Sequence, residues 1–221
     1  MRKPYFIFLI IILILTISFV NALNQNNKLE LLGKIIYLDA GHGGLDPGTV
    51  YKTIYEKDIN LKIVKKLQKI LESEGAIVYL TRYGDYDLSN NYTTYRKKSD
   101  LNNRAKIINE SGADLYISIH LNSINSSTWC GAQVFYDDAN DKNEKLATLM
   151  QKQLQKDLKT DREVKEINNM LMNRKIKIPG ILIEAGFLSN PNDRYKLQDD
   201  EYQYKIADSI NKGIINYFNN V

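Results

Sequence analysis

The chain has 221 residues, which is enough for one well-packed domain and leaves little room for two. Its net charge is +4, and its lysines are spread along the chain instead of being interleaved with aromatic residues, so nothing indicates a nucleic-acid-binding surface. A single cysteine, Cys130, excludes an internal disulfide bond.

The first predicted element is an apolar segment at the N-terminus. Arg2 and Lys3 precede a run over residues 5–20 that only two hydroxyl residues interrupt. This pattern is typical of a secretory signal or an uncleaved membrane anchor, because a core helix would have a polar face. The run is shorter than the ~20 residues that span a bilayer comfortably. A small residue, Ala22, follows where a signal peptidase could cut, so cleavage is favoured.

The N-terminal charges also predict orientation. Because positive flanks stay on the cytoplasmic side, the chain after Ala22 is expected outside the membrane, which it contacts only through this segment. We therefore predict a signal peptide or anchor over residues 1–22, a linker over 23–33, and one folded domain over 34–221.

Strand-like and helix-like runs alternate along that domain. Strands are predicted at residues 34–39, 76–81, 115–120, 132–136 and 179–185, and helices at residues 58–74, 101–110, 143–158 and 201–218. The polar stretch 85–100 is expected to be a surface loop. Strands separated by helices of this length indicate an α/β fold, a single domain whose mainly parallel sheet is covered by helices on both faces.

The chain has only two histidines, and each follows a hydrophobic strand. His42 comes after the first strand, and His120 closes the strand over residues 115–120. Groups at the carboxyl ends of parallel strands converge on one crevice. The pair therefore favours a shared metal site over two separate structural histidines.

Two glutamates are expected at the same edge of the sheet. Glu56 immediately precedes the first predicted helix, where it can reach the crevice or interact favourably with the N-terminus of that helix. Glu184 lies in an apolar run over residues 181–187, where an ionised carboxylate is costly unless it has a partner. Two imidazoles and one carboxylate are a typical catalytic zinc set, and a second carboxylate can carry a proton from bound water to a leaving amine. The residues alone indicate a metal hydrolase of unnamed reaction.

Together these motifs resemble the zinc-dependent N-acetylmuramoyl-L-alanine amidases. The resemblance runs over about residues 34–218 and is carried by LDAGHGG (38–44), Asp46, Gly48, EKD (56–58), Thr81, Arg82, Asp85, LNNRA (101–105), SIHLN (118–122) and EAGFLSN (184–190). It implies a sheet of about six strands flanked by helices, with zinc (Zn²⁺) held by His42, Glu56 and His120. It also implies that Glu184 is the catalytic carboxylate, which activates water and protonates the leaving amine.

Within this family, a closer resemblance is to the group that acts on the spore cortex of endospore formers. It is carried by the MRK start with its apolar run, GKIIYLD (33–39), YRKK (95–98), ADLYISIHLN (113–122), and Gln133 in place of the glutamate that many wall amidases have. The group's substrate would be peptidoglycan, from whose muramic acid it strips peptides before a deacetylase allows the muramic δ-lactam needed in germination to form. This implies an extracytoplasmic location, in the intermembrane space or cortex region of the developing spore. Dependence on an accessory protein stays open.

Three further residues are candidates for contact with substrate. Arg104 could bind a substrate carboxylate or pair with Asp85. Asn122 could orient the substrate or stabilise the turn after its strand, and Trp129 could stack on a sugar or cap the core.

Two other functions fit parts of the pattern. A zinc carboxypeptidase or endopeptidase of wall peptides would share the ligand types, although the HExxH motif is absent. A non-catalytic wall-binding protein on the same scaffold would be expected to have lost a ligand or the glutamate, whereas all four positions are filled here.

Overall fold

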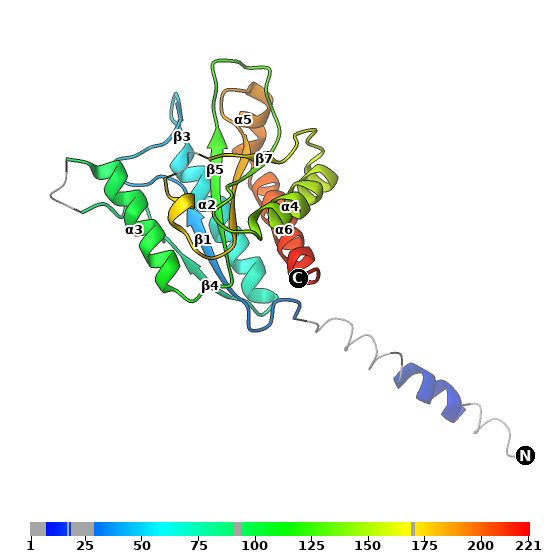
Figure 1. Cartoon of the computed structure of the whole chain (residues 1–221). Coiled ribbons are helices and arrows are strands. Elements are labelled where there is room, and N and C mark those ends of the chain that lie inside the picture. Colours follow the sequence, from blue (N-terminus) through cyan, green and yellow to red (C-terminus); the bar gives the residue numbers. More distant parts are fainter. Residues whose placement is uncertain (1–7, 17, 19–28, 91–93, 169–170) are drawn as a thin grey trace, which may run out of the picture.

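The computed structural model describes residues 8–16, 18, 29–90, 94–168 and 171–221. Within them a six-stranded sheet has the order β4-β1-β5-β8-β6-β7 (Figure 1). Its strands are β1 (Ile35–Ala40), β4 (Ile77–Leu80), β5 (Leu115–Asn122), β6 (Gln133–Tyr136), β7 (Lys165–Glu166) and β8 (Gly180–Phe187), and a separate hairpin joins β2 (Val50–Tyr51) to β3 (Ile54–Tyr55). The helices are α2 (Glu56–Ser73), α3 (Arg96–Glu110), α4 (Asn143–Leu158), α5 (Pro191–Leu197), α6 (Asp200–Phe218) and the 3₁₀ helix η1 (Asn173–Lys175).

The sheet is mainly parallel. Every pairing of neighbouring strands is parallel except that of β6 with β8. The carboxyl ends of β1, β5 and β8 therefore lie at one edge, where a parallel α/β sheet gathers its functional groups. The predicted fold class is confirmed.

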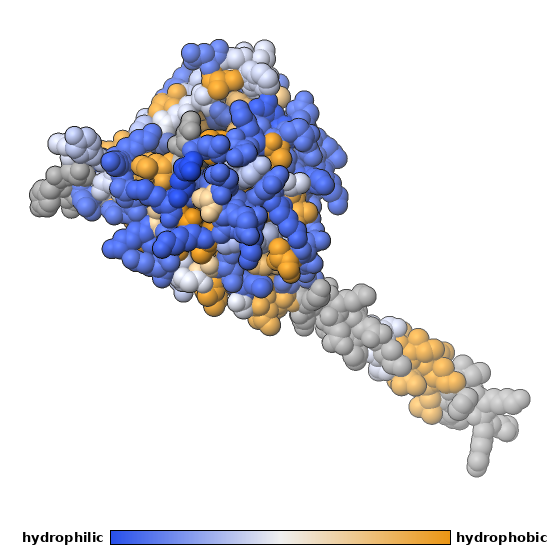
Figure 2. All heavy atoms as spheres, in the orientation of Figure 1, coloured by the Kyte–Doolittle hydropathy of each residue, from blue (hydrophilic) through white to orange (hydrophobic). Residues whose placement is uncertain are grey.

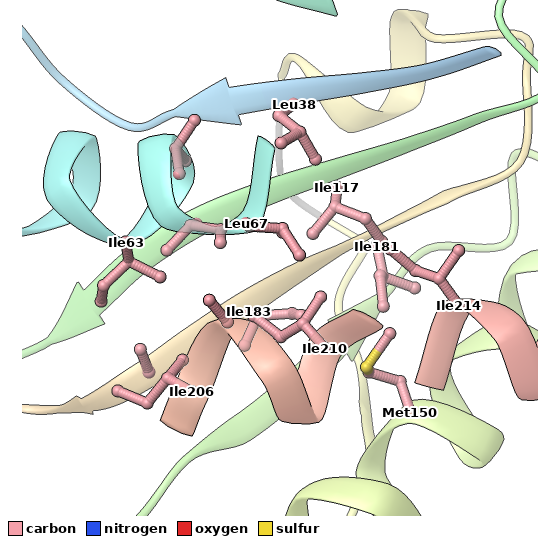
Figure 3. Close-up of a cluster of buried hydrophobic side chains, with 14 of the residues drawn as sticks. Leu38, Ile63, Leu67, Ile117, Met150, Ile181, Ile183, Ile206, Ile210 and Ile214 are labelled. Carbon is pink, nitrogen blue, oxygen red and sulfur yellow. The ribbon is translucent and has the colours of Figure 1, made fainter. Parts of the chain in front are cut away.

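The main apolar core lies between the sheet and helices α2, α4 and α6. In Figure 3 the strand side chains Leu38, Ile117, Ile181 and Ile183 pack against Ile63, Leu67, Met150, Ile206, Ile210 and Ile214 of the helices. Each such buried side chain contributes about 1.5–3 kcal/mol relative to an exposed one. This packing holds the strands in fixed positions, and with them the side chains on the opposite face of the sheet.

The opposite face of the sheet has a smaller cover. Tyr37 and Tyr116 of the strands pack there against Ile108 of α3 and against Met172 and Ile176 beside η1. Among the described residues, α3 and the η1 segment are the helical cover of this face.

Two helix starts differ from the sequence prediction. Helix α3 begins at Arg96, so the prediction of a loop over residues 85–100 is wrong for residues 96–100. The first turn of α3 is polar, and its buried member is Asp100, which pairs with Arg104 one turn later and gives no apolar signal. The sequence predicts Glu56 just before the first helix, whereas Glu56 is the first residue of helix α2. Strands β2, β3 and β7 and helix α5 were not predicted.

The N-terminal apolar segment is helical over residues 8–16. Its large apolar side chains are 41–63% exposed, and Figure 2 shows them as a hydrophobic stretch in contrast to the largely hydrophilic domain surface. Across the described residues no helix has both the length and the apolar character needed to cross a membrane. The rest of the predicted signal or anchor except residue 18, and residues 23–28 of the predicted linker, lie outside the described residues. Leu31 is fully buried in the main core, so the folded part includes it.

Candidate metal centre and cleft

The turn that carries His42 follows β1 directly. His42 has a φ of 63°, a left-handed conformation that residues other than glycine rarely adopt. Next to it, Gly43 and Asp46 exchange backbone hydrogen bonds of 2.9 and 3.0 Å. The guanidinium of Arg104 donates to the His42 carbonyl at 2.7 Å and the guanidinium of Arg82 donates to that of Gly41 at 3.1 Å, so two buried cations hold the strained turn in place.

Three side chains converge at this edge. His42, Glu56 and His120 place one potential ligand atom each within 4.8 Å of one another. Glu56 Oε1 lies 3.2 Å from His42 Nε2 and 3.1 Å from His120 Nδ1. The two imidazole rings meet edge to face, with centroids 4.9 Å apart. The turn after β1, the first residue of α2 and strand β5 thus bring together the three residues that the sequence grouped.

The Glu56 carboxylate has an unusual concentration of donors. Besides the two imidazoles, Oε1 faces the backbone N–H of Leu121 at 3.0 Å and the side-chain amide of Asn60 at 3.3 Å. Burial raises the pKa of Glu56, but the contacts with His120 and His42 outweigh burial and hold that pKa well below its usual range. A permanently ionised, buried carboxylate between two imidazoles suits a cation held among the three side chains.

The second nitrogen of His42 also faces a carboxylate. Nδ1 lies 2.9 Å from Asp46 Oδ2, and Asp46 Oδ1 accepts from the backbone N–H of Gly48 at 3.0 Å. Burial lowers the pKa of His42, but Glu56 and Asp46 together raise it above its usual value. A proton on Nδ1 directed at Asp46 would leave Nε2 free to bind a cation together with Glu56, which is the arrangement of a metal-binding histidine with an outer carboxylate. The donor set fits zinc.

Glu184 lies beside this cluster. On β8 it is the register partner of His120 on β5. Its side chain is partly open to the cleft, but Oε2 is inaccessible and has no hydrogen-bond partner among the described residues. Burial raises the pKa of Glu184 to about 7, the negative charge of Glu56 adds to this rise, and the two histidines oppose it. Glu184 is therefore a carboxyl group that can hold or release a proton near neutral pH.

Two adjoining cavities form the cleft above these residues. One of about 370 Å³ is lined by the three clustered residues together with Glu184, Asn122 and Lys97. The other, of about 400 Å³, shares His42, His120 and Lys97 with the first and extends under α3 and η1, where its walls are mainly apolar. The cluster thus lies where an extended substrate can reach it from two directions.

Asn122 and Arg104 lie in different surroundings. Asn122 is the last residue of β5 and lines the first cavity, and its carbonyl accepts from Leu188 N at 2.9 Å. Arg104 is only 1% exposed and pairs with Asp39 at 2.7 Å and Asp100 at 2.9 Å. The alternative pairing of Arg104 with Asp85 is wrong, because Asp85 pairs with a lysine of α2. These contacts favour positioning of the His42 turn over substrate contact for Arg104.

Lys97 is a cleft residue that the sequence prediction missed. It is exposed on the first turn of α3 and lines both cavities of the cleft. The run Arg96-Lys97-Lys98 was assigned to a loop because it has no apolar periodicity. A capping signal before Arg96 would have revealed the helix start, but Tyr95 makes no side-chain cap. Asp46 and Asn60 were likewise not assigned roles beside the metal ligands.

The α/β fold and the polar cleft at the carboxyl ends of its strands fit a hydrolase, and the comparison with known families gives its type. Residues 36–216 match the family described as N-acetylmuramoyl-L-alanine amidase, and the chain belongs to this family. The resemblance inferred from the motifs is confirmed.

Within the family, the chain is similar to the following individual proteins. Over 195 residues the chain is 46% identical to the germination-specific N-acetylmuramoyl-L-alanine amidase of Bacillus subtilis (strain 168), an alignment that covers 86% of this chain and 82% of that protein. It is similar in structure to the CwlD amidase from Clostridioides difficile, solved in complex with the GerS lipoprotein, with a TM-score of 0.82, 40% identity and coverage of 86% of this chain and 100% of that one. An N-acetylmuramoyl-L-alanine amidase from Clostridium difficile 630 has a TM-score of 0.75 at 34% identity, with 84% of this chain and 97% of that chain covered.

Proposed function

We propose that this protein is a zinc-dependent N-acetylmuramoyl-L-alanine amidase that hydrolyses the amide between N-acetylmuramic acid and L-alanine in peptidoglycan. Family membership supports the reaction, and the His42, Glu56 and His120 donor set supports zinc. The observation that carries the proposal is Glu184, an unpaired, protonatable carboxyl group next to the donor set. In a merely structural site such a buried group would have a partner.

The residues of the cleft have two separate roles, metal binding and proton transfer. Zinc held by His42, Glu56 and His120 would supply a Lewis acid and lower the pKa of bound water to about 7. Glu184 is the general base that accepts the proton of the attacking water, and then the general acid that delivers it to the nitrogen of the departing L-alanine. Its pKa of about 7 suits both roles, because a general acid–base group is most effective near the working pH.

Other side chains position the reactants. Asn122, on the cleft wall next to the metal centre, is proposed to orient the substrate. Arg104 is a weaker candidate for substrate contact, since its guanidinium is occupied by Asp39, Asp100 and two carbonyls, and we assign it to holding the His42 turn.

The substitution Glu184→Gln tests the mechanism. It keeps the shape of the side chain and removes proton transfer, so turnover on muropeptides should fall by about 10²–10⁴-fold while the zinc content of the purified protein stays at one equivalent. Mass spectrometry of wild-type products should show peptide-free glycan and peptides with a free N-terminal L-alanine. Loss of zinc would make Glu184 a ligand, and undiminished turnover would end its catalytic assignment. Cleavage within the peptide would indicate a peptidase.

We infer a biological role in the spore cortex. Similarity to a germination-specific amidase and to CwlD supports stripping of peptides from cortex muramic acid, before a muramic-acid deacetylase acts and the muramic δ-lactam forms. The complex of CwlD with the GerS lipoprotein supports an accessory protein for this chain too. A strain that lacks the gene should make spores without δ-lactam that germinate poorly. Normal δ-lactam levels would instead indicate general wall turnover.

The proposed location is outside the cytoplasm, in the intermembrane space or cortex region of the developing spore. It rests on a signal peptide or membrane anchor over residues 1–22, a linker over residues 23–33, of which Leu31 packs in the core, and the catalytic domain over residues 34–221. A fusion of residues 1–30 to a reporter that is active only after export should be active, and replacement of Arg2 and Lys3 by glutamate should weaken it. A reporter that stays inactive would contradict the location.

A further inference from the structure

A row of polar side chains crosses the sheet from the metal centre toward β6. His120 on β5 is paired with Glu184 on β8, and Glu184 is paired with Gln133 on β6. Residues in register on adjacent strands project from the same face of the sheet, and adjacent strands lie ~4.8 Å apart. Gln133 is therefore on the open face with Glu184, about 10 Å, or two strand spacings, from His120.

Arg162 continues this row. Its Nε and Nη2 atoms donate to Gln133 Oε1 at 3.1 and 2.6 Å, and Gln133 Nε2 in turn donates to the carbonyl of Glu163 at 2.8 Å. The guanidinium lies 4.8 Å from the ring centroid of Trp129 and 5.5 Å from that of Phe187. One oxygen that accepts two hydrogen bonds and two aromatic rings thus fix the plane of the guanidinium next to Gln133.

This fixed cation has no anionic partner in the described part of the chain. The buried Arg104 has two carboxylates, whereas the acceptor of Arg162 is the neutral amide of Gln133. Among the described residues Nη1 of Arg162 has no acceptor, so this nitrogen remains available to hydrogen-bond a ligand. A planar guanidinium with a free edge is suited to bidentate binding of a carboxylate. Trp129, which is half exposed, leaves one side of this group accessible.

The order of the row indicates which part of the substrate reaches Arg162. If Glu184 protonates the departing amine, the peptide lies on the Glu184 side of the metal centre, which is the side of Gln133 and Arg162. The second residue of a peptidoglycan stem is D-glutamate, joined onward through its side chain, so its α-carboxylate is free. In an extended chain that carboxylate lies roughly 7 Å beyond the scissile amide, in the direction of Gln133, which is about 10 Å from His120 and is hydrogen-bonded to Arg162.

We propose that Arg162, held by Gln133 and Trp129, binds the α-carboxylate of the second stem-peptide residue and so selects peptides in which this group is not amidated. This inference rests on the proposed function, because it takes the orientation of the peptide from the role of Glu184.

The experiment compares two N-acetylmuramoyl dipeptides that differ only at that group, one ending in D-glutamate and the other in its α-amide, D-isoglutamine. Wild-type protein should have a kcat/KM about tenfold or more higher on the acid, because a hydrogen-bonded charge is lost in the amide. Arg162→Gln should raise KM for the acid more than for the amide, until the two substrates differ by less than about twofold in kcat/KM. Arg162→Lys should keep part of the preference, since it retains the charge without the fork.

Lys97→Gln is the matched control. It removes a different cation, one that lines the cleft beside the metal centre, so the preference for the acid should survive whatever happens to overall turnover. An equal loss on both substrates in Arg162→Gln would mean that Arg162 only supports the fold, and an undiminished preference would place the carboxylate elsewhere. Either result overturns the inference.

Binding gives a readout that does not need turnover. Trp129 is the only tryptophan of the chain, so intrinsic tryptophan emission reports on this group of residues alone. In Glu184→Gln, titration with the acid dipeptide should change the emission at concentrations at least about tenfold lower than the amide requires. Equal titrations would overturn the inference. If wild-type protein cleaved neither dipeptide nor intact muropeptides while the emission still discriminated the acid, the proposed function would fail and the carboxylate site would stand.

Discussion

Two clusters of buried charge lie side by side at the carboxyl end of the sheet, and they are built differently. One joins Asp39 of β1 to Arg104 and Asp100 of α3. The other is the metal-centre cluster of His42, Glu56 and His120, with Glu184 beside it. Strand β1 leads into both clusters and both contain buried carboxylates, so burial alone does not distinguish them.

The first cluster is internally satisfied. Asp39 accepts from Arg104 at 2.7 Å, Thr81 at 2.8 Å and Ser118 at 2.6 Å. Burial raises the pKa of Asp39, but Arg104 leads a set of contacts that outweigh burial and lower it to about 2. Nothing in this cluster needs a further ligand. Its role is to fix β1 and the turn that follows.

In the second cluster the numbers of hydrogen-bond donors and acceptors do not match. Glu56 has more donors than one carboxylate oxygen needs, while Glu184 has an oxygen without a partner in the described part of the chain. Under the proposed function, a bound cation would relieve the first imbalance and a proton or substrate group would relieve the second. The comparison teaches that the pattern of hydrogen bonds, more than burial, separates charges that support a fold from charges kept for chemistry.

The largest expected effect comes from removing an imidazole of the second cluster. His42→Ala or His120→Ala should reduce bound zinc below one equivalent and abolish amidase activity, because one nitrogen ligand is lost. The fold should survive, since the main core on the other face of the sheet is untouched. Zinc analysis, circular dichroism and muropeptide assays measure the three properties. Full zinc with normal turnover in either variant would show that the ligand assignment is wrong.

The next largest effect is a loss of stability, expected when the cation of the first cluster is removed. Arg104→Met should lower the free energy of unfolding by about 3–5 kcal/mol, because it leaves the buried Asp39 and Asp100 without their cation. Urea titration measures the change. Lys66→Met is the control, since its partner Asp200 is highly exposed and a surface pair is worth about 0–1 kcal/mol. A similar, small loss in both variants would contradict the distinction between the clusters.

The smallest effect concerns the pH dependence of stability in metal-free protein. The pKa of Glu184 is raised from 4.5 to about 7 in the folded chain, so as pH rises between these values the unfolded chain loses its proton first and stability falls. Glu184→Gln has no such group, so its stability relative to wild type should increase by on the order of 2 kcal/mol from pH 4.5 to pH 7.5. Urea titrations after chelation measure this difference. A constant difference across that range would mean that the carboxyl group has a partner in solution.

Much of the site was predictable because the signals are local. His42 and His120 each follow an apolar run, and Glu184 interrupts one, so strand periodicity is enough to place them at one edge of a parallel sheet. The family could be inferred from the motifs for the same reason, because their residues and their order can be compared without knowing any distance in the fold.

Other features could not be predicted because they depend on contacts between distant segments. The early start of α3, which brings Lys97 over the cleft, is stabilised by Asp100 inside the fold and leaves no apolar pattern. Arg104 resembles a substrate-binding residue in sequence, and only its three-dimensional contacts with Asp39 and the His42 carbonyl show that it supports the turn.

The sequence by itself determined the main strands, the helices that cover them and the residue types of the candidate metal site, because hydrophobic periodicity and residue chemistry are local properties of the chain. Tertiary structure alone decided which charges are satisfied. Among the residues that the structure describes, Glu56 lies between two imidazoles, Glu184 keeps an unpaired oxygen, and Arg162 faces a neutral amide instead of a carboxylate. The physical reason is that the free energy of a buried charge depends on the atoms within a few ångströms of it, and here those atoms come from strands and turns far apart in the sequence.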